Sequence, residues 1–243
     1  MQLIKLDATE STNSYLKGLL GHDELGDFTV VLTDNQTKGR GQINASWSSE
    51  PGKNLTFSVL KFFNGIGPQH QFLINVCVSL AIYDALAAVG VPRLSIKWPN
   101  DILSGASKIC GILIENLISG QEIKSTIIGI GLNVNQTVFS KGLNASSIKL
   151  QLGMEVNKEE LLELILSMLK ESLSQVDVHQ WKSLYERYQK EMFRKDMPST
   201  FQKPDGSFFT GIIQGITQNG MLKIHLENDE RLEFNFKEVK LLY

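Results

Sequence analysis

The chain has few of the residues that would assign a function class at once. It holds only two cysteines among 243 residues, and Cys77 and Cys110 each lie inside an apolar run, which predicts buried thiols and not a disulfide or metal framework. Lysine plus arginine (24) do not exceed aspartate plus glutamate (26), so the basic excess typical of nucleic-acid binding is absent. We therefore expect a reducing, cytoplasmic location and no nucleic-acid partner.

Long apolar runs and several catalytic motifs are absent as well. No uninterrupted apolar stretch approaches the roughly 18–20 residues of a membrane span, and the start, MQLIKLDATE, lacks the basic lead and apolar core of a signal peptide. The motifs GxxxxGK[ST], GxSxG and HExxH do not occur, and the four histidines have no paired spacing. We expect no membrane contact, no transition-metal site and no histidine-based acyl transfer. The histidines are His22, His70, His179 and His225.

The apolar pattern divides the chain into two parts. Strands and helical stripes alternate as far as residue 193, whereas short alternating strands separated by hairpin turns follow from residue 194. We predict a larger domain over 1–193 and a small antiparallel barrel over 194–243. The hairpin turns are Asn219-Gly220 and Asn228-Asp229.

Individual elements of the larger domain follow from the same patterns. Apolar residues at helical spacing between 69 and 90 predict a core helix, and Asn157 with Glu160 resembles a capping box that opens another helix. Further helices are predicted at 11–21 and 181–193, and strands at 28–34, 54–63, 95–98, 108–116 and 125–135.

The segment 95–115, SIKWPNDILSGASKICGILIE, is the most informative stretch. Pro99 cannot continue a central strand, so Asn100 and Asp101 are predicted to lie in a turn with side chains free to face a ligand. Lys97, just before the turn, indicates that this ligand is an anion. The alternative is an ordinary surface turn with a solvated lysine.

Three other segments carry weaker indications. In the long connection TKGRGQINASW, Gly39 and Gly41 permit close approach of the backbone, and Arg40 suits a carboxylate or phosphate, although a flexible surface loop is the alternative. The segment of Ser11, Thr12 and Asn13 caps a helix or binds a carbonyl oxygen or an anion. In GIGLNVN (129–135), alternating glycines leave room for a flat ligand, or the segment is simply a packed strand.

Taken together and in this order, the segments ESTNSYLK, QTKGRGQINASWSSEPGKNLTFS, KWPNDIL with KICGILIE, and GIGLNVN resemble the motif set of the biotin protein ligases over nearly the whole chain. The resemblance implies a mixed β-sheet packed with helices, followed by an SH3-like barrel. It implies an ATP-dependent enzyme that activates biotin as biotinyl-5′-AMP, with Mg²⁺ brought by ATP. The biotinyl group then passes to a lysine of a biotin carboxyl carrier protein, a subunit of acetyl-CoA carboxylase or a related carboxylase.

The resemblance also assigns site residues position by position. Lys97 and Arg40 are the catalytic cations, and Lys97 meets the biotin carboxylate and the α-phosphate. The ureido ring is assigned to Ser11, Thr12 and Gln36 with the backbone of Gly39, Arg40 and Gly41; the valeryl tail to Gly111 and Ile112; and the nucleotide to Trp47, Asn100, Asp101 and Asn133. Asn13 and Gln42 are counted among the binding residues without a more specific role.

The chemistry of such a reaction fits these residue types. A carboxylate and a phosphate that meet at ~4 Å in an effective dielectric near ~20 repel by about 4 kcal/mol, which is roughly a thousandfold in rate. Fixed cations and Mg²⁺ offset terms of this size, and no nucleophilic side chain is needed. The segment 38–47 is the candidate lid that protects the adenylate from water.

Two rival functions stay open: a lipoate or octanoyl carrier-protein transferase, and a non-enzymatic biotin-binding module. Adenylate formation with biotin but not lipoate distinguishes the first, and biotin-dependent ATP–pyrophosphate exchange, which Lys97→Ala is expected to abolish, distinguishes the second. The carrier, the base that activates its lysine and the oligomeric state, a homodimer included, are not decided by the sequence. Some relatives begin with a DNA-binding module, whereas the STN motif here starts at residue 11, so no repressor function is expected.

Many relatives carry arginines where Gln42 and Ala45 stand, so this loop has fewer fixed positive charges. We predict that Gln42→Arg slows the escape of the adenylate, because a restored guanidinium would hold the phosphate. Rapid filtration measures the release rate. An unchanged rate would count against the prediction.

Overall fold

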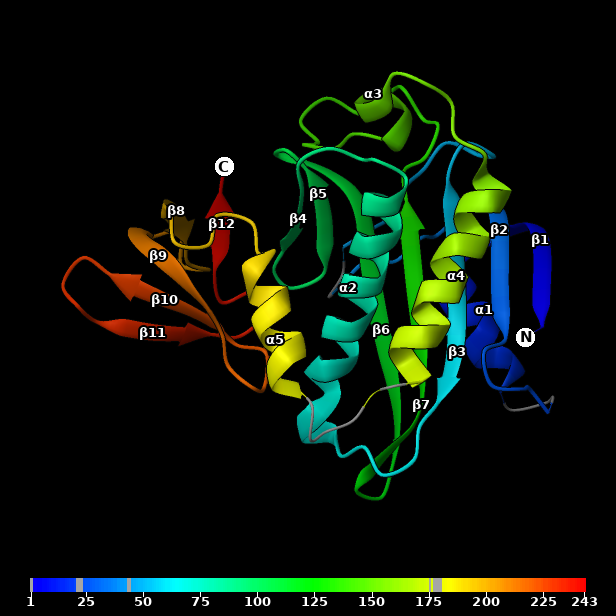
Figure 1. The fold of residues 1–243 in the computed structure, drawn as a ribbon, viewed down its shortest axis with the longest axis horizontal. Helices are drawn as coiled ribbons and strands as arrows, with labels where there is room; N and C mark the ends of the chain where they lie inside the picture. The colour runs from blue at the N-terminus through cyan, green and yellow to red at the C-terminus, as the bar shows by residue number, and fades with distance from the viewer. Residues whose placement is uncertain (1, 21–23, 43–44, 175, 177–180) are drawn as a thin grey trace.

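A seven-stranded sheet organises the larger part of the protein in this computed structural model, which describes residues 2–20, 24–42, 45–174, 176 and 181–243. The strand order is β1-β2-β3-β7-β6-β5-β4 (Figure 1). β1 and β2 run parallel and all other neighbours are antiparallel, so the sheet is mixed, as predicted. The strands are β1 (Leu3–Thr9), β2 (Val30–Gln36), β3 (Leu55–Phe62), β4 (Leu94–Lys97), β5 (Asp101–Ser104), β6 (Ser107–Ser119) and β7 (Glu122–Leu132).

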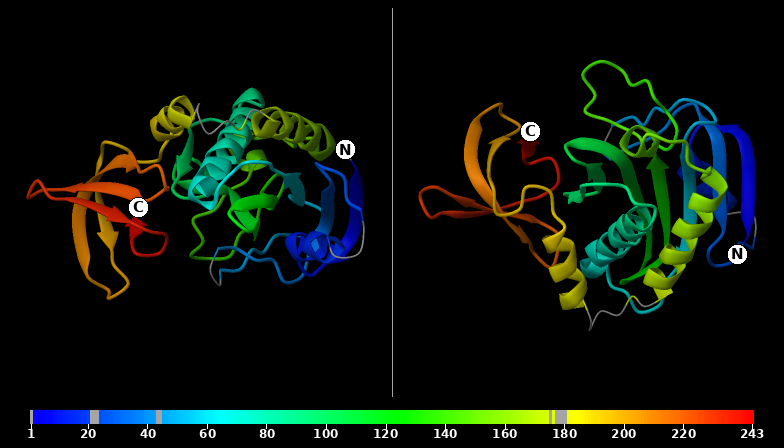
Figure 2. Two further views of the ribbon diagram at one scale, coloured as in Figure 1. Left: turned by 90° about the horizontal axis from the view of Figure 1, so that it is seen from below. Right: turned by 45° about the horizontal axis from the view of Figure 1, so that its top comes forward.

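Helices cover both faces of this sheet. α2 and α4 lie against one face, while the short α1 lies on the other (Figures 1 and 2). Leu16 of α1 packs there on Val31, Leu60 and Ile127, a small core separate from the main one. The helices are α1 (Thr12–Leu19), a 3-10 turn (Pro68–His70), α2 (Gln71–Ala88), α3 (Ile148–Leu152), α4 (Lys158–Ser174) and α5 (Trp181–Lys190).

The helix α2 is apolar on nearly all sides because it lies between the sheet, α4 and α5. With the turn before it, Pro68–Ala88 is long and apolar enough to cross a membrane, although polar residues interrupt its apolar run. Its most apolar window is 72% buried inside the fold, as expected for the predicted core helix. The capping box is also confirmed, since Asn157 Nδ2 donates to Glu160 Oε1 at 2.8 Å and Asn157 Oδ1 accepts from the backbone of the first turn of α4.

The last part of the chain forms a second, five-stranded antiparallel sheet in the order β11-β10-β9-β8-β12. Both predicted hairpins are present, and Gly220 (φ 85°) and Asp229 (φ 62°) supply the left-handed backbone that their turns need. In the described chain the edge strands β11 and β12 do not pair with each other, so closure into a barrel is not observed. The strands are β8 (Pro198–Gln202), β9 (Phe208–Ile216), β10 (Leu222–Leu226), β11 (Arg231–Phe234) and β12 (Lys240–Leu242).

Several predictions about single elements were wrong or incomplete. Asp101 does not lie in a turn, because it pairs with both Lys97 and Gly111 as the first residue of β5. The sequence patterns also missed β1, β5, β8 and α3, which are short or lie at sheet edges where alternation is weak. Gly21, the predicted stop of the first helix, and the histidines His22 and His179 lie outside the described residues.

The interior strand β3 provides a test of this core. Phe57→Ala should lower the free energy of unfolding by about 3–5 kcal/mol, because Phe57 is fully buried and the cavity left behind cannot collapse completely. Phe62→Ala, at the exposed end of the same strand, is the matched control and should cost about 1 kcal/mol or less. Urea denaturation measures both, and equal losses would contradict this packing.

Candidate functional site

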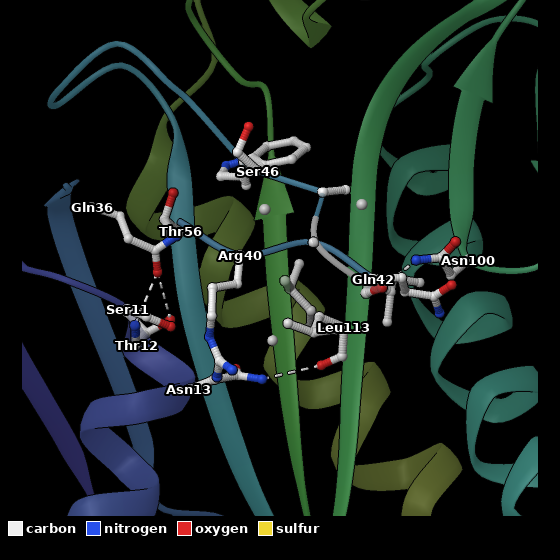
Figure 3. Close-up of a pocket in the computed structure, with 18 of the residues that line it drawn as sticks. Ser11, Thr12, Asn13, Gln36, Arg40, Gln42, Ser46, Thr56, Asn100 and Leu113 are labelled. Carbon is white, nitrogen blue, oxygen red and sulfur yellow. Dashed lines mark hydrogen bonds between the residues drawn. The ribbon is translucent and has the colours of Figure 1, made fainter. Parts of the chain in front are cut away.

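The floor of the site is a strip of sheet without side chains. Gly111 of β6 lies directly opposite Gly131 of β7, and the same row continues to Thr56 on one side and Asp101 on the other. Residues opposite one another in antiparallel strands point to the same face, so two polar side chains flank a bare centre. Gly129, two residues from Gly131, extends this strip. A cavity of about 210 Å³ lies above it, on the face that carries α1 (Figure 3).

Trp47 covers the floor from above. A Cβ placed on Gly131 would lie only 2.4 Å from Trp47 Cε2, and one on Gly111 would lie 3.2 Å from Trp47 Cζ3. The indole therefore rests on the backbone itself, which glycine alone permits. Its Nε1 is buried and has no hydrogen-bond partner among the described residues, so this donor is available to a ligand. A flat or narrow ligand can lie between the ring and the strip if the ring moves away.

Neutral hydrogen-bonding groups gather at one end of the cavity. The backbone N–H of Thr12 donates to Gln36 Oε1 at 2.9 Å, and Thr12 Oγ1 lies 2.7 Å from the hydroxyl of Ser58. Ser11 is the N-cap of α1 and accepts from the Ser14 N–H. Figure 3 shows Ser11, Thr12, Asn13 and Gln36 on the same side of the cavity. This end is suited to a neutral group with several carbonyl and N–H positions.

The opposite end is charged. Lys108 Nζ lies 2.6 Å from Asp101 Oδ1, and it also lies 5.5 Å from the centre of the Trp47 ring. Lys108 and Asp101 both line the cavity. Asn100 completes this end, since its Nδ2 donates to Ile112 O at 2.6 Å. One carboxylate and one ammonium thus face the cavity where the glycine strip ends.

Lys97 lies one strand further out. It pairs with Asp101 on the edge strand β4, and its Nζ lies 3.8 Å from Asp101 Oδ2 and 5.2 Å from the centre of the Tyr243 ring. Burial holds the pKa of the Lys97 ammonium below its usual value, while Asp101 opposes this shift and Lys108 adds to it. Lys97 lines a neighbouring cavity between the two sheets and not the one above the glycine strip.

The turn between Lys97 and Asp101 is fixed from three directions. Pro99 O accepts hydrogen bonds from Asn75 Nδ2 of α2 at 2.7 Å and from the Tyr188 hydroxyl of α5 at 3.1 Å. Trp98 Nε1 donates to Gly220 O of the second sheet at 2.9 Å. Contacts with α2, α5 and the hairpin of the second sheet therefore fix the position of the turn, and with it the charged end of the cavity.

Most of the predicted site residues come together in this cavity. Twelve of the fifteen line it: Ser11, Thr12, Asn13, Gln36, Arg40, Gly41, Gln42, Trp47, Asn100, Asp101, Gly111 and Ile112. Gly39 does not, but a Cβ there would lie 2.5 Å from Gln36 Nε2, so it supports a residue that does. Lys97 lies outside, as described above.

Asn133 is placed elsewhere by the fold. It follows β7, is 4% exposed, and its Nδ2 donates to Ser146 O at 2.9 Å, which ties down the segment after the strand. Arg40 lines the cavity but is directed to Glu115 (2.9 Å) at the neutral end, not to the charged end. Neither Lys108 nor Glu115 was predicted as a site residue, although both stand in the segment KICGILIE. The contacts that identify them, Lys108 with Asp101 and Glu115 with Asn13, are visible only in the folded structure.

No group of three or more His, Cys, Asp or Glu side chains in the described chain could hold a metal ion. Burial raises the pKa of the Cys77 thiol to about 12 and that of Cys110 higher still, so neither is a ready nucleophile. This site offers hydrogen-bonding groups at one end, a strip of glycine backbone under Trp47 in the middle, and an ammonium paired with a carboxylate at the other end. The fold and the cavity define a protein that binds an elongated small molecule with a neutral and an anionic end.

Comparison with known proteins agrees with this class. Residues 6–133, more than half of the chain, match the model of the Biotin/lipoate A/B protein ligase family, and the chain belongs to that family. A "Bifunctional ligase/repressor BirA" of Bacillus spizizenii is 29% identical over 92% of this chain and 72% of its own length. A "Biotin--[acetyl-CoA-carboxylase] ligase" of Paracoccus denitrificans is 28% identical over 89% of this chain and 91% of its own.

Among solved structures, the biotin protein ligase from Aquifex aeolicus in complex with biotin and ATP is similar to this chain. It superposes with a TM-score of 0.80 at 25% identity and covers 99% of this chain and 98% of that one. Both parts of the present structure, the seven-stranded sheet and the second sheet, are thus within the similarity.

Proposed function

We propose that this chain is a biotin protein ligase. It joins biotin and ATP to form biotinyl-5′-AMP and pyrophosphate, and then transfers the biotinyl group to the ε-amine of a carrier-protein lysine with release of AMP. The relatives of similar length are named as biotin ligases, and the Aquifex neighbour holds biotin and ATP.

The observation that carries this function is the order of groups along the cavity. Biotin has a neutral ureido ring, an alkyl chain and a carboxylate. The cavity has neutral donors and acceptors at Thr12 and Gln36, a bare strip at Gly111 and Gly131, and the ammonium of Lys108 at its far end. A polar ring that leaves water must regain its hydrogen bonds, and an alkyl chain needs none, so each part meets the surface that it requires.

We assign the charge neutralisation between the two anionic reactants chiefly to Lys108. It lines the cavity, whereas Lys97 is separated from it by Asp101. Asp101 holds the Lys108 ammonium while the site is empty, and an arriving carboxylate competes for the same ammonium. Lys97 remains next to Asp101 and keeps that carboxylate partly neutralised.

Mg²⁺ fits this end of the cavity. Asp101 and Asn100 offer the carboxylate and amide oxygens that Mg²⁺ prefers alongside phosphate oxygens. When bound, the ion would neutralise charge on the phosphates. We propose that it arrives with ATP and that these two residues hold it.

The other expectations from the resemblance are proposals of the same kind. We propose that the chain divides near residues 193 and 194 and that the second sheet is the counterpart of an SH3-like barrel. We further propose a carboxylase carrier domain as the acceptor and the cytoplasm as the location. Lipoate is the alternative substrate, because the matching family includes lipoate ligases.

Biotin-dependent ATP–pyrophosphate exchange tests the proposed function directly. The protein should catalyse exchange with biotin and show none above background with lipoate, because the neutral end would leave its hydrogen-bonding groups unpaired against a dithiolane ring. Exchange with lipoate alone would reverse the assignment. Tight biotin binding without exchange would instead identify a binding module.

A pair of lysine variants tests the assignment of the cation. Lys108→Ala should reduce the exchange rate by about a thousandfold, the size of one unneutralised contact between anions. Lys97→Ala, the matched control in charge and volume, should reduce it far less, in contrast to the expectation from sequence alone. A greater loss in the Lys97 variant would return the catalytic role to Lys97.

A further inference from the structure

The ion pair between Arg40 and Glu115 has no part in the reaction as assigned above. Glu115 lies four residues along β6 from Gly111, which is about 13 Å from the row that ends in Asp101. The Arg40 guanidinium, 2.9 Å from Glu115 Oε2, is therefore directed away from the place where the two anions would react (Figure 3).

Glu115 also contacts the neutral end of the cavity. The same oxygen, Oε2, accepts a hydrogen bond from Asn13 Nδ2 at 2.7 Å. Asn13 is 2% exposed, and its Oδ1 accepts from the Ser58 hydroxyl at 2.5 Å. Ser58 in turn contacts Thr12, whose backbone binds Gln36. A continuous chain of polar contacts thus connects the loop residue Arg40 with the groups assigned to the ureido ring.

In the described residues, the first half of the loop is attached to the rest of the fold mainly at its start, where the Lys38 N–H donates to Glu10 O at 2.9 Å. Arg40 forms an isolated bridge with Ser46, and the Gly41 N–H donates to Ala45 O at 2.7 Å, but both contacts lie within the loop itself. Lys38 pairs with Glu10, and these two side chains are 71% and 68% exposed. Solvent screens such a pair, whereas the Glu115 side chain is only 26% exposed and already bound by a buried amide.

We propose that Glu115 is a positioning residue that anchors Arg40, and with it the first half of the loop, to the neutral end of the cavity. The proposal rests on the proposed function. Through Arg40 and Asn13, this single carboxylate couples the position of the loop to the groups that bind the ureido ring. Biotin then meets a loop that is already in place over its ring, and less ordering is required on binding.

Glu115→Gln tests this role, because it keeps the shape of the side chain and removes only its charge. Hydrogen–deuterium exchange at the Gly41 amide, measured without any ligand, should become about three- to tenfold faster, in line with the loss of a charge-assisted contact. The KM for biotin in ATP–pyrophosphate exchange should rise by about the same factor, with kcat changed less, since the reacting groups lie at the other end. Glu10→Gln is the matched control, because it removes the same charge from the exposed pair at the start of the loop, and it should change neither quantity.

A charge reversal separates the ion pair from the stability of the strand. Arg40→Glu and Glu115→Arg should each speed amide exchange at Gly41, and the double variant should recover a large part of the protection. If Glu115→Gln behaves like Glu10→Gln, or if the double variant recovers nothing, the anchor is overturned. If amide exchange accelerates while the KM for biotin stays constant, the coupling to the ureido end is overturned. A wild-type protein without biotin-dependent exchange would overturn the proposed function instead, and the comparison of amide exchange rates would still decide on the anchor.

Discussion

The antiparallel register that sets Gly111 opposite Gly131 is the constraint on which the site depends. Where two neighbouring strands both lack a side chain at the same level, the sheet offers a smooth strip, and a ring or an alkyl chain can lie on its backbone. A shift of either strand by one residue would turn the glycines to the other face and bring Ile112 or Ile130 up in their place. The buried neighbours of these strands, packed beneath α2 and α4, hold the register.

The polar groups are arranged around this strip by elements that are distant in sequence. α1 and β2 supply the neutral end, and β5 and β6 supply the charged end. Asp101 lies between two lysines and keeps like charges close together in the absence of a ligand, at a place where burial already disfavours the ammonium of Lys97. Such a cluster is costly unless every charge has a partner. An anionic ligand can replace Asp101 as the partner of Lys108 without a large rearrangement.

Much of this site could be anticipated from the residues alone. The segments around Ser11, Gly39, Asn100 and Gly129 were recognised from their residues, Gly111 was assigned from the resemblance, and each lies at or next to the cavity. Lys97 and Asn133 are the two assigned residues that lie away from this cavity, for the same reason in both cases. A motif states which residues are near one another along the chain, but the pairing of strands decides which of them face the ligand. Lys97 lies one strand further out, on β4 of the β4–β5 hairpin, and Asn133, just after β7, donates its side-chain amide to Ser146 O.

The sequence by itself determined the local elements and the chemical kinds of group that the protein uses, because helix caps, hairpin turns and apolar periodicity depend on near neighbours. It also indicated that a lysine, an Asn-Asp pair and alternating glycines belong to one function. Only the tertiary structure decided that Lys108 and not Lys97 borders the cavity, that Arg40 turns to Glu115, and that Trp47 lies on the glycine strip. These are contacts between residues that are far apart in the chain, and their geometry follows from strand register and helix packing, which no local pattern encodes.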